Sequence, residues 1–163
     1  MRIEVTADVF RLAQVFTISR GSRTEAKVLT VRVSDGGAVG MGECVPYARY
    51  GETLESVTAQ IEGLPADVTR AGLYDLLPAG AARNAVDCAL WDLEAKQAGK
   101  SVRELAGLAP LGPEITAYTL SLDTPQAMQV QAAENAFRPL LKIKLGTPDD
   151  MPRLEAVRAG APD

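Results

Sequence analysis

Residues 115 to 159 alternate between strand and helix patterns, and this rhythm restricts the fold more than any other feature of the sequence. An apolar strand pattern over 115–122 is followed by a helix that Thr124 should cap, with proline at its first position. A second strand pattern over 139–145 precedes a second helical pattern over 149–159. This order is typical of parallel α/β folds. Two such units bury little apolar surface by themselves, so the pattern predicts the beginning of a (β/α) barrel.

The first part of the chain has the pattern of an antiparallel sheet. Apolar and polar residues alternate over 2–12, 25–33 and 38–44, which predicts three strands. The SDGG segment at 34–37 joins the second and third strands, and its glycines can adopt the positive φ angles of a tight turn. We therefore expect a three-stranded meander.

Helical patterns follow the predicted sheet. Thr53, three residues before Ser56, matches a helix N-cap, and a second short helix is predicted over 66–77. The strongest pattern covers 79–100 and includes Cys88, which we expect to be a small core residue. Its apolar stripe has helical spacing and consists of Val86, Ala89, Leu90 and Leu93.

A segment rich in proline and glycine, LAPLGP at 108–113, marks the expected domain boundary. It follows a last short helix for which Ser101 and Glu104 form a capping box. The sequence therefore predicts an α+β capping domain over 1–112, followed by the first two βα units of a truncated (β/α) barrel over 113–163.

Composition excludes several classes of function. The formal net charge of −4 gives no basic surface for nucleic acid, and no apolar run is long enough to cross a membrane. We therefore expect neither a nucleic acid nor a membrane as partner. The N-terminus lacks a signal-peptide core, and the two cysteines lie far apart and match no metal spacing, so we expect a cytoplasmic location. The chain has no histidine. Any acid–base chemistry must therefore use lysine, a carboxylate, tyrosine or cysteine.

The LLKIKLG segment at 140–146 carries two lysines one residue apart. Successive side chains of a strand point to opposite faces, so Lys142 and Lys144 share one face while the apolar residues share the other. One interpretation is a half-exposed strand whose lysines lie in water. The other is a pair of ammonium groups directed into one enclosed site. The alternation alone is more typical of the first.

Longer motifs resemble a known family. A meander, helices and a barrel that opens with K-x-K resemble the enolase superfamily, and within it the muconate-lactonizing subgroup. RGSRTEA at 20–26, GECVPYARYGET at 42–53 and PAGAARNAVDCALWDLEAK at 78–96 resemble the N-terminal part of bacterial dipeptide epimerases, which interconvert L-Ala-D-Glu and L-Ala-L-Glu. The resemblance implies that the small domain caps a barrel in which Mg²⁺, held by three carboxylates, binds the substrate carboxylate. Two lysines on opposite faces then remove and return the α-proton.

This resemblance assigns roles to both lysines of K-x-K. It implies that Lys144 is the acid/base and that Lys142 contacts the substrate carboxylate. The physics agrees, because a nearby ammonium and burial both favour the neutral form that a lysine base requires. Positive charge also stabilises the enediolate that forms when the α-proton leaves. With the longer motifs included, we favour the enclosed-site interpretation.

Two further residues match substrate-contacting positions of the family. Thr119, on the first barrel strand, is implied to touch substrate; the alternative is a β-branched residue that fills a strand. Arg23 is implied to pair with the side-chain carboxylate of the glutamyl residue, since a guanidinium suits bidentate contact. The alternatives are a solvated loop arginine, or Arg20 in the same role.

The sequence departs from the family in its metal site. The resemblance implies that the Mg²⁺ ligands and the second catalytic lysine lie on later barrel strands, which this sequence does not contain. Asp149, Asp150 and Asp163 do not correspond to those ligands. We therefore expect Mg²⁺ only in the complete enzyme, and neither a metal site nor epimerase activity in residues 1–163 alone.

Three interpretations of function remain. The chain is the N-terminal portion of a dipeptide epimerase, an isomerase acting on a small dipeptide. Alternatively, it belongs to another subgroup enzyme, such as an N-acylamino-acid racemase, an o-succinylbenzoate synthase or a muconate cycloisomerase. In the third interpretation it is a non-catalytic capping or dimerisation module. The expected protein partner is a second copy of the chain or the missing barrel portion.

Overall fold

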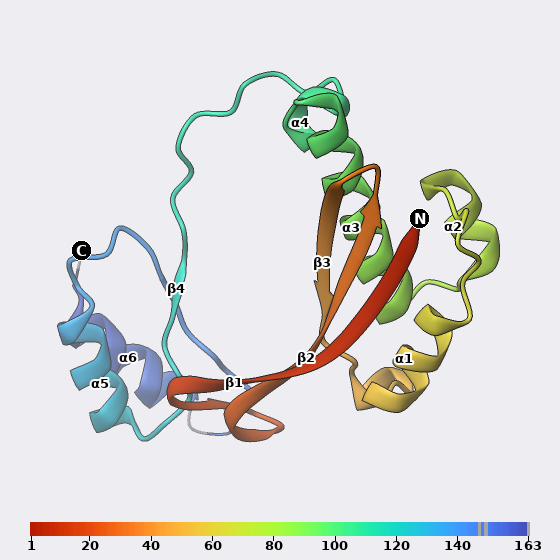
Figure 1. The fold of residues 1–163 in the computed structure, drawn as a ribbon. Helices are drawn as coiled ribbons and strands as arrows, with labels where there is room; N and C mark the ends of the chain where they lie inside the picture. The colour runs from red at the N-terminus through yellow and green to blue at the C-terminus, as the bar shows by residue number, and fades with distance from the viewer. Residues whose placement is uncertain (147, 149, 163) are drawn as a thin grey trace. The chain divides into compact units, whose positions relative to one another are not determined.

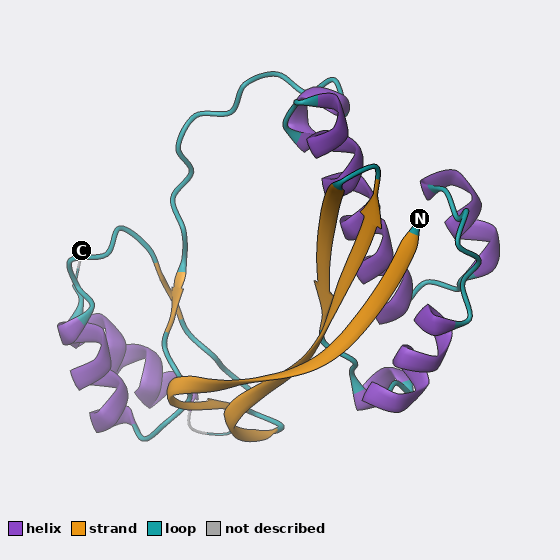
Figure 2. Cartoon of the chain, in the orientation of Figure 1, coloured by secondary structure: helices purple, strands orange, loops and turns teal. Residues whose placement is uncertain are grey.

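The computed structural model describes residues 1–146, 148 and 150–162. The chain folds as two compact units (Figures 1 and 2). The first comprises Met1–Phe10 and Ala26–Leu111, and the second comprises Arg11–Glu25 and Gly112–Asp163. The domain boundary after residue 112 stays a prediction. The structure adds that the far end of the first hairpin belongs to the second unit.

An antiparallel sheet is the framework of the first unit, as the alternation predicts. Its strands lie in the order β1 (Arg2–Ile18), β2 (Gly21–Asp35) and β3 (Ala38–Cys44). Asp35 pairs with Ala38 across a two-residue turn. Gly36 and Gly37 form this turn with φ angles of 56° and 85°, which confirms the predicted hairpin. β1 and β2 are longer than predicted, because the hairpin continues beyond the segments that show apolar alternation.

Helices follow the sheet in the first unit: η1 (Ala48–Tyr50), α1 (Leu54–Glu62), α2 (Arg70–Leu76), α3 (Ala81–Ala98) and α4 (Val102–Leu105). The predicted caps at Thr53 and Ser101 are both present as reciprocal capping boxes. The helix predicted from residue 66 begins later, at Arg70. The reason is that the Thr69 hydroxyl accepts the N–H of Gly72 at 3.1 Å, which caps the helix at that point.

The core of the first unit lies between the sheet and α3. The predicted stripe is confirmed, because all of its members are buried: Val86, Ala89, Leu90 and Leu93. They pack with Leu29, Val31 and Val33 of β2. Cys88 is exposed, so its prediction as a core residue was wrong. Its position on the helix turns its side chain away from the face that packs on the sheet.

Two glycines of β3 allow α3 to approach the sheet closely. A Cβ atom built on Gly42 would overlap the carbonyl oxygen of Ala85, and one built on Gly40 would overlap that of Ala89. Both glycines are buried and alternate along the strand, so both lie beneath the helix. The distance between α3 and the sheet of the first unit therefore depends on the absence of side chains at these two positions.

We expect Gly42→Ala to lower the free energy of unfolding by about 3 kcal/mol, because the added methyl group meets helix backbone that cannot move aside. Urea unfolding followed by circular dichroism measures this difference. Gly112→Ala is the matched control, since a Cβ atom there meets nothing within 4 Å. Equal stability of the two variants would contradict the close approach of α3.

The second unit contains the two βα units that the sequence predicts. Its elements are β4 (Tyr118–Thr119), α5 (Pro125–Glu134), β5 (Leu141–Lys142) and α6 (Asp150–Gly160). Thr124 caps α5 as predicted, with its hydroxyl accepting the N–H of Ala127. Both strands are shorter than predicted, because the parallel ladder between them has two residue pairs. Among the described residues, no helix is long and apolar enough to cross a membrane.

Candidate functional site

The parallel pair of β4 and β5 places two of the predicted site residues, Thr119 and Lys142, on neighbouring strands, and Lys144 follows two residues after the end of β5. Thr119 is the register partner of Lys142. The N–H of Leu120 donates to the Lys142 carbonyl at 2.8 Å, and the N–H of Tyr118 donates to the Leu140 carbonyl at 2.9 Å. These bonds fix which side chains share a face.

One face of this pair packs against the helices. Leu120 is buried in a cluster with Met128 of α5 and Val157 of α6, and Leu141 and Ile143 pack against the same cluster. Side chains alternate along an extended strand, so Thr119, Lys142 and Lys144 project from the opposite face. The K-x-K segment therefore has an apolar side, which packs on α5 and α6, and a lysine side, which does not.

The Lys142 ammonium influences the ionisation of Lys144. The Lys142 ammonium, together with weaker effects of desolvation and a hydrogen bond between the two side chains, lowers the pKa of Lys144 below its usual value. Two like charges on one strand face disfavour each other, so one lysine loses its proton more readily. The Lys142 ammonium therefore shifts the ionisation of Lys144 toward the neutral amine, which is the direction that a proton-abstracting role requires.

Lys142→Met should raise the pKa of Lys144, because it removes the ammonium that disfavours protonation. In a proton-abstraction role, the acidic limb of the pH–rate profile would move to higher pH. The titration itself can be followed in residues 1–163 by NMR of ¹³C-labelled lysine ε-carbons. Lys100→Met, which removes a lysine from the first unit, is the control. An unchanged pKa in Lys142→Met would contradict the coupling.

The far end of the β1–β2 hairpin belongs to the same compact unit as the lysines. Arg23 lies there on β2 with an exposed side chain, and Arg20 lies in the turn between β1 and β2. The Thr17 and Ser22 hydroxyls, on β1 and β2, lie 2.9 Å apart and are hydrogen-bonded. The structure thus gathers Arg23, Thr119 and both lysines in one unit, although residues 26 to 111 separate them in the sequence.

Ser121 is the residue of this unit that sequence reasoning missed. It is buried and bonds to the hairpin through its hydroxyl. Its signal in the sequence is a small polar residue between Leu120 and Leu122, on the same strand face as Thr119. That pattern indicates a polar contact on the lysine side but does not identify the partner.

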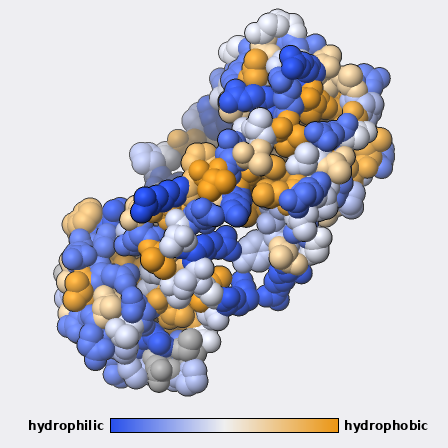
Figure 3. All heavy atoms as spheres, turned by 60° about the horizontal axis from the view of Figure 1, so that its bottom comes forward, coloured by the Kyte–Doolittle hydropathy of each residue, from blue (hydrophilic) through white to orange (hydrophobic). Residues whose placement is uncertain are grey.

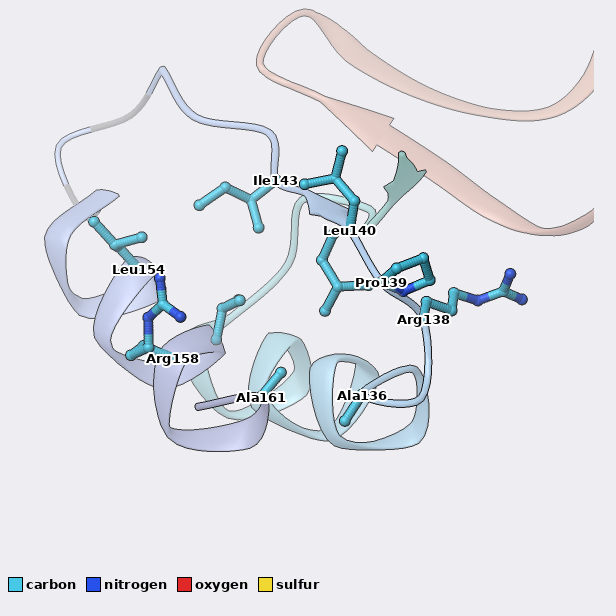
Figure 4. Close-up of a pocket in the computed structure, with 10 residues that line it drawn as sticks. Ala136, Arg138, Pro139, Leu140, Ile143, Leu154, Arg158 and Ala161 are labelled. Carbon is cyan, nitrogen blue, oxygen red and sulfur yellow. The ribbon is translucent and has the colours of Figure 1, made fainter. Parts of the chain in front are cut away.

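The apolar side of β5 borders a cavity of about 220 Å³ (Figure 4). Ile143, Leu154 and Ala161 line it, with Arg138 and Arg158 at its border. Because the cavity lies on the helix side of the strand, it is separated from the face that carries Lys142 and Lys144. It is a gap in packing between β5 and α6 and does not extend the candidate site.

A second cavity, of about 560 Å³, lies within the first unit. Its lining includes Cys44, Val45, Tyr47, Tyr50, Glu52 and Asn84. The Glu52 carboxylate accepts the N–H of Ala81 at 2.6 Å and that of Tyr47 at 3.0 Å, so it holds the start of α3. Burial, with smaller contributions from Glu52 and Glu43, raises the pKa of Cys44 to about 11. This thiol stays protonated at neutral pH and does not provide a nucleophile.

The described residues do not assemble a metal site. Among residues 1–146, 148 and 150–162, no group of three or more His, Cys, Asp or Glu side chains could hold a metal ion. Asp150 accepts the N–H of Gly146 at 2.7 Å and lies 3.9 Å from the Arg153 guanidinium, so it is engaged at the start of α6. Asp149 and Asp163 lie outside the described residues.

Known proteins resemble this chain along nearly its whole length. It is 42% identical over 167 residues to L-Ala-D/L-Glu epimerase of Escherichia coli (strain K12), covering 99% of this chain and 52% of that protein. It is 43% identical over 141 residues to N-acetyl-D-glutamate racemase of Pseudoalteromonas sp, covering 83% and 44%. The chain thus spans about half the length of the curated relatives it matches.

Solved structures of enolase-family proteins also resemble this chain along nearly its whole length. An enolase family member from Agrobacterium tumefaciens, with homology to dipeptide epimerases and with bound sodium and L-Ala-L-Glu, has a TM-score of 0.92 and 55% identity, covering 98% of this chain and 50% of that one. A dipeptide epimerase from Enterococcus faecalis V583, complexed with Mg and L-Leu-L-Tyr, has a TM-score of 0.82 and 29% identity, covering 97% and 49%.

A family model agrees with these relatives. The mandelate racemase / muconate lactonizing enzyme N-terminal domain matches residues 1–107. This match covers the sheet and helices of the first unit together with the β1–β2 hairpin. The chain therefore belongs to the mandelate racemase and muconate lactonizing enzyme family of the enolase superfamily.

Proposed function

We propose that the chain is the N-terminal portion of a dipeptide epimerase that interconverts L-Ala-D-Glu and L-Ala-L-Glu. The observation that carries this proposal is the pairing of Thr119 with Lys142, which places Lys144 on the face away from the helices and beside a second ammonium. The names of the two curated relatives support the substrate class, because each name describes a substrate in which the nitrogen of a glutamate is acylated.

In this proposal Lys144 moves the proton. Its neutral amine takes the α-proton of the glutamyl residue from one face, and its ammonium returns a proton in the reverse direction. Lys142 lies beside the substrate carboxylate, where positive charge stabilises the enediolate. Thr119, opposite Lys142 on β4, contacts the bound substrate from the neighbouring strand.

Arg23 provides specificity in this proposal. A guanidinium matches a carboxylate with two parallel hydrogen bonds, and the glutamyl side chain is the carboxylate that distinguishes this substrate from an uncharged dipeptide. The position of Arg23 on the hairpin end within the same compact unit as the lysines supports this role.

Magnesium belongs to the complete enzyme in this proposal. The Enterococcus faecalis relative, which is complexed with Mg, supports a metal in the family. The described residues of this chain do not form a ligand set. No step is therefore assigned to the metal through this chain, whose own contribution is the lysine pair and the hairpin.

The test joins residues 1–163 to the remaining barrel of the Escherichia coli relative. We expect this chimera to exchange the α-proton of L-Ala-L-Glu in D₂O and to form L-Ala-D-Glu, both followed by NMR. Residues 1–163 alone, expected to be inactive, are the control.

A second candidate function, racemisation of N-acetylglutamate, is favoured by the 43% identity to N-acetyl-D-glutamate racemase and is assayed in parallel. If the chimera turns over N-acetylglutamate faster than the dipeptide, N-acetylglutamate becomes the proposed substrate. If it turns over neither compound, the proposal is refuted.

Exposed apolar side chains support a protein partner. Figure 3 shows apolar residues at the surface among hydrophilic ones. In the second unit, Ile115 and Phe137 are large apolar residues that are 65% and 77% exposed. Exposed apolar surface of this kind is typical of protein contacts. We propose the remaining barrel strands as the partner of the second unit, with a second copy of the chain as the alternative that analytical ultracentrifugation would detect.

A further inference from the structure

Ser121 joins the first barrel strand to the hairpin by hydrogen bonds. Its side chain is 6% exposed. The hydroxyl accepts the N–H of Thr17 at 2.7 Å and donates to the carbonyl of Val15 at 3.3 Å. The N–H of Leu122 donates to the Thr17 carbonyl at 3.0 Å. Three hydrogen bonds thus connect two adjacent residues after β4 with one edge of β1.

The connection continues from β1 to the strand that carries Arg23. The Thr17 hydroxyl is hydrogen-bonded to the hydroxyl of Ser22, which immediately precedes Arg23. The turn of the hairpin also approaches the end of the K-x-K segment, because a Cβ atom on Gly146 would lie 3.2 Å from the Cβ of Ser19. The hairpin end is therefore held near the ends of both barrel strands.

A hydroxyl suits this position for a physical reason. Serine accepts and donates at the same time, so one small side chain satisfies both the Thr17 N–H and the Val15 carbonyl. Alanine at position 121 would remove the partner of both groups, and the half-buried Thr17 N–H would lose the acceptor that the buried hydroxyl provides. Ser121 also lies two residues after Thr119, so both side chains share the face on which Lys142 lies.

We infer that Ser121 is a positioning residue: it anchors the end of the hairpin to the first barrel strand and so sets where Arg23 meets the side chain of the substrate. This inference rests on the proposed function for its consequence in specificity. Its structural part, the anchor itself, stands on the contacts alone. The two parts therefore need separate measurements.

The anchor is tested by amide hydrogen exchange in residues 1–163, without any assay of activity. Ser121→Ala should speed exchange of the Thr17 amide about tenfold or more, because its acceptor is lost. Ser34→Ala, which makes the same change on β2 in the first unit, should leave Thr17 unaffected. Ser121→Thr keeps the hydroxyl and should restore protection. Retained protection at Val31 verifies that each variant is folded, and unchanged exchange at Thr17 in a folded Ser121→Ala variant would overturn the anchor.

The positioning of Arg23 is tested in the chimera that carries the complete barrel. Ser121→Ala should raise KM for L-Ala-L-Glu about tenfold with little change in kcat, and should leave KM for L-Ala-L-Leu nearly unchanged. A loss of kcat, or equal increases of KM for both substrates, would overturn the positioning role. An inactive parent chimera would refute the proposed function and the role in specificity together, while the exchange experiment would still decide whether Ser121 anchors the hairpin.

Discussion

Replacing Lys144 with alanine in the complete enzyme is expected to lower the rate of epimerisation by roughly 10²–10⁴-fold, the usual contribution of a general acid–base group. The neighbouring Lys142 ammonium lowers the pKa of Lys144 and so increases the fraction of its neutral amine. Alanine removes that amine while leaving the β4–β5 ladder, which is made of backbone bonds, intact. NMR of L-Ala-L-Glu and L-Ala-D-Glu in D₂O measures epimerisation and α-proton exchange separately.

Two variants make this result specific. Lys144→Arg keeps the positive charge but holds its proton at any accessible pH, so it should be as inactive as the alanine variant. Lys100→Ala removes a lysine of the first unit and should retain full activity. In a two-base reaction, Lys144→Ala still exchanges the α-proton of the one epimer that faces the other base. Exchange of both epimers at the parent rate would rule out Lys144 as a base.

Arg23→Met is expected to raise KM for L-Ala-L-Glu by about 30-fold to several thousand-fold, which corresponds to the roughly 2–5 kcal/mol lost with one buried charge-assisted contact. Methionine keeps much of the length and apolar volume of the side chain, so the change isolates the guanidinium. KM for L-Ala-L-Leu should change little, because that substrate has no side-chain carboxylate. Steady-state kinetics with both dipeptides gives the comparison.

Arg20→Met is the matched control, since it removes the neighbouring arginine from the turn of the same hairpin. It should leave the preference for L-Ala-L-Glu intact. If Arg20→Met loses the preference and Arg23→Met does not, the specificity role moves to Arg20. Equal losses for both dipeptides in Arg23→Met would remove this residue from the specificity assignment.

Features that depend on neighbours along the chain could be predicted from the sequence. Thr53, Ser101 and Thr124 cap helices as predicted, because a cap needs a side chain and an N–H only three residues apart. The opposite faces of Lys142 and Leu141 follow from the two-residue period of a strand, and the cluster around α5 and α6 contains Leu141 as that period requires.

Features that depend on distant residues could not be predicted in the same way. β1 reaches Ile18 within the hairpin, although residues 13 to 18 lack the alternation of an isolated strand, and the distant Leu122 donates its N–H to the Thr17 carbonyl on the edge of β1. In the sequence, Gly40 and Gly42 are simply two glycines within a strand pattern. Only the position of α3 in the structure shows that a side chain does not fit at either residue. The roles of Lys142, Lys144, Thr119 and Arg23 stay predictions, since they depend on a bound substrate and on further barrel strands.

The bond between Thr17 and Ser121 spans 104 residues and has a consequence for the order of folding. The Gly36–Gly37 turn joins two adjacent strands, so the sheet of the first unit can begin to form early during synthesis. The hairpin end cannot dock until Ser121 has left the ribosome, roughly 5 to 20 seconds after Thr17 at ordinary elongation rates. During that interval the hairpin has no barrel strand to hold it. The segment that should select the substrate is thus among the last parts of this chain to reach its final position.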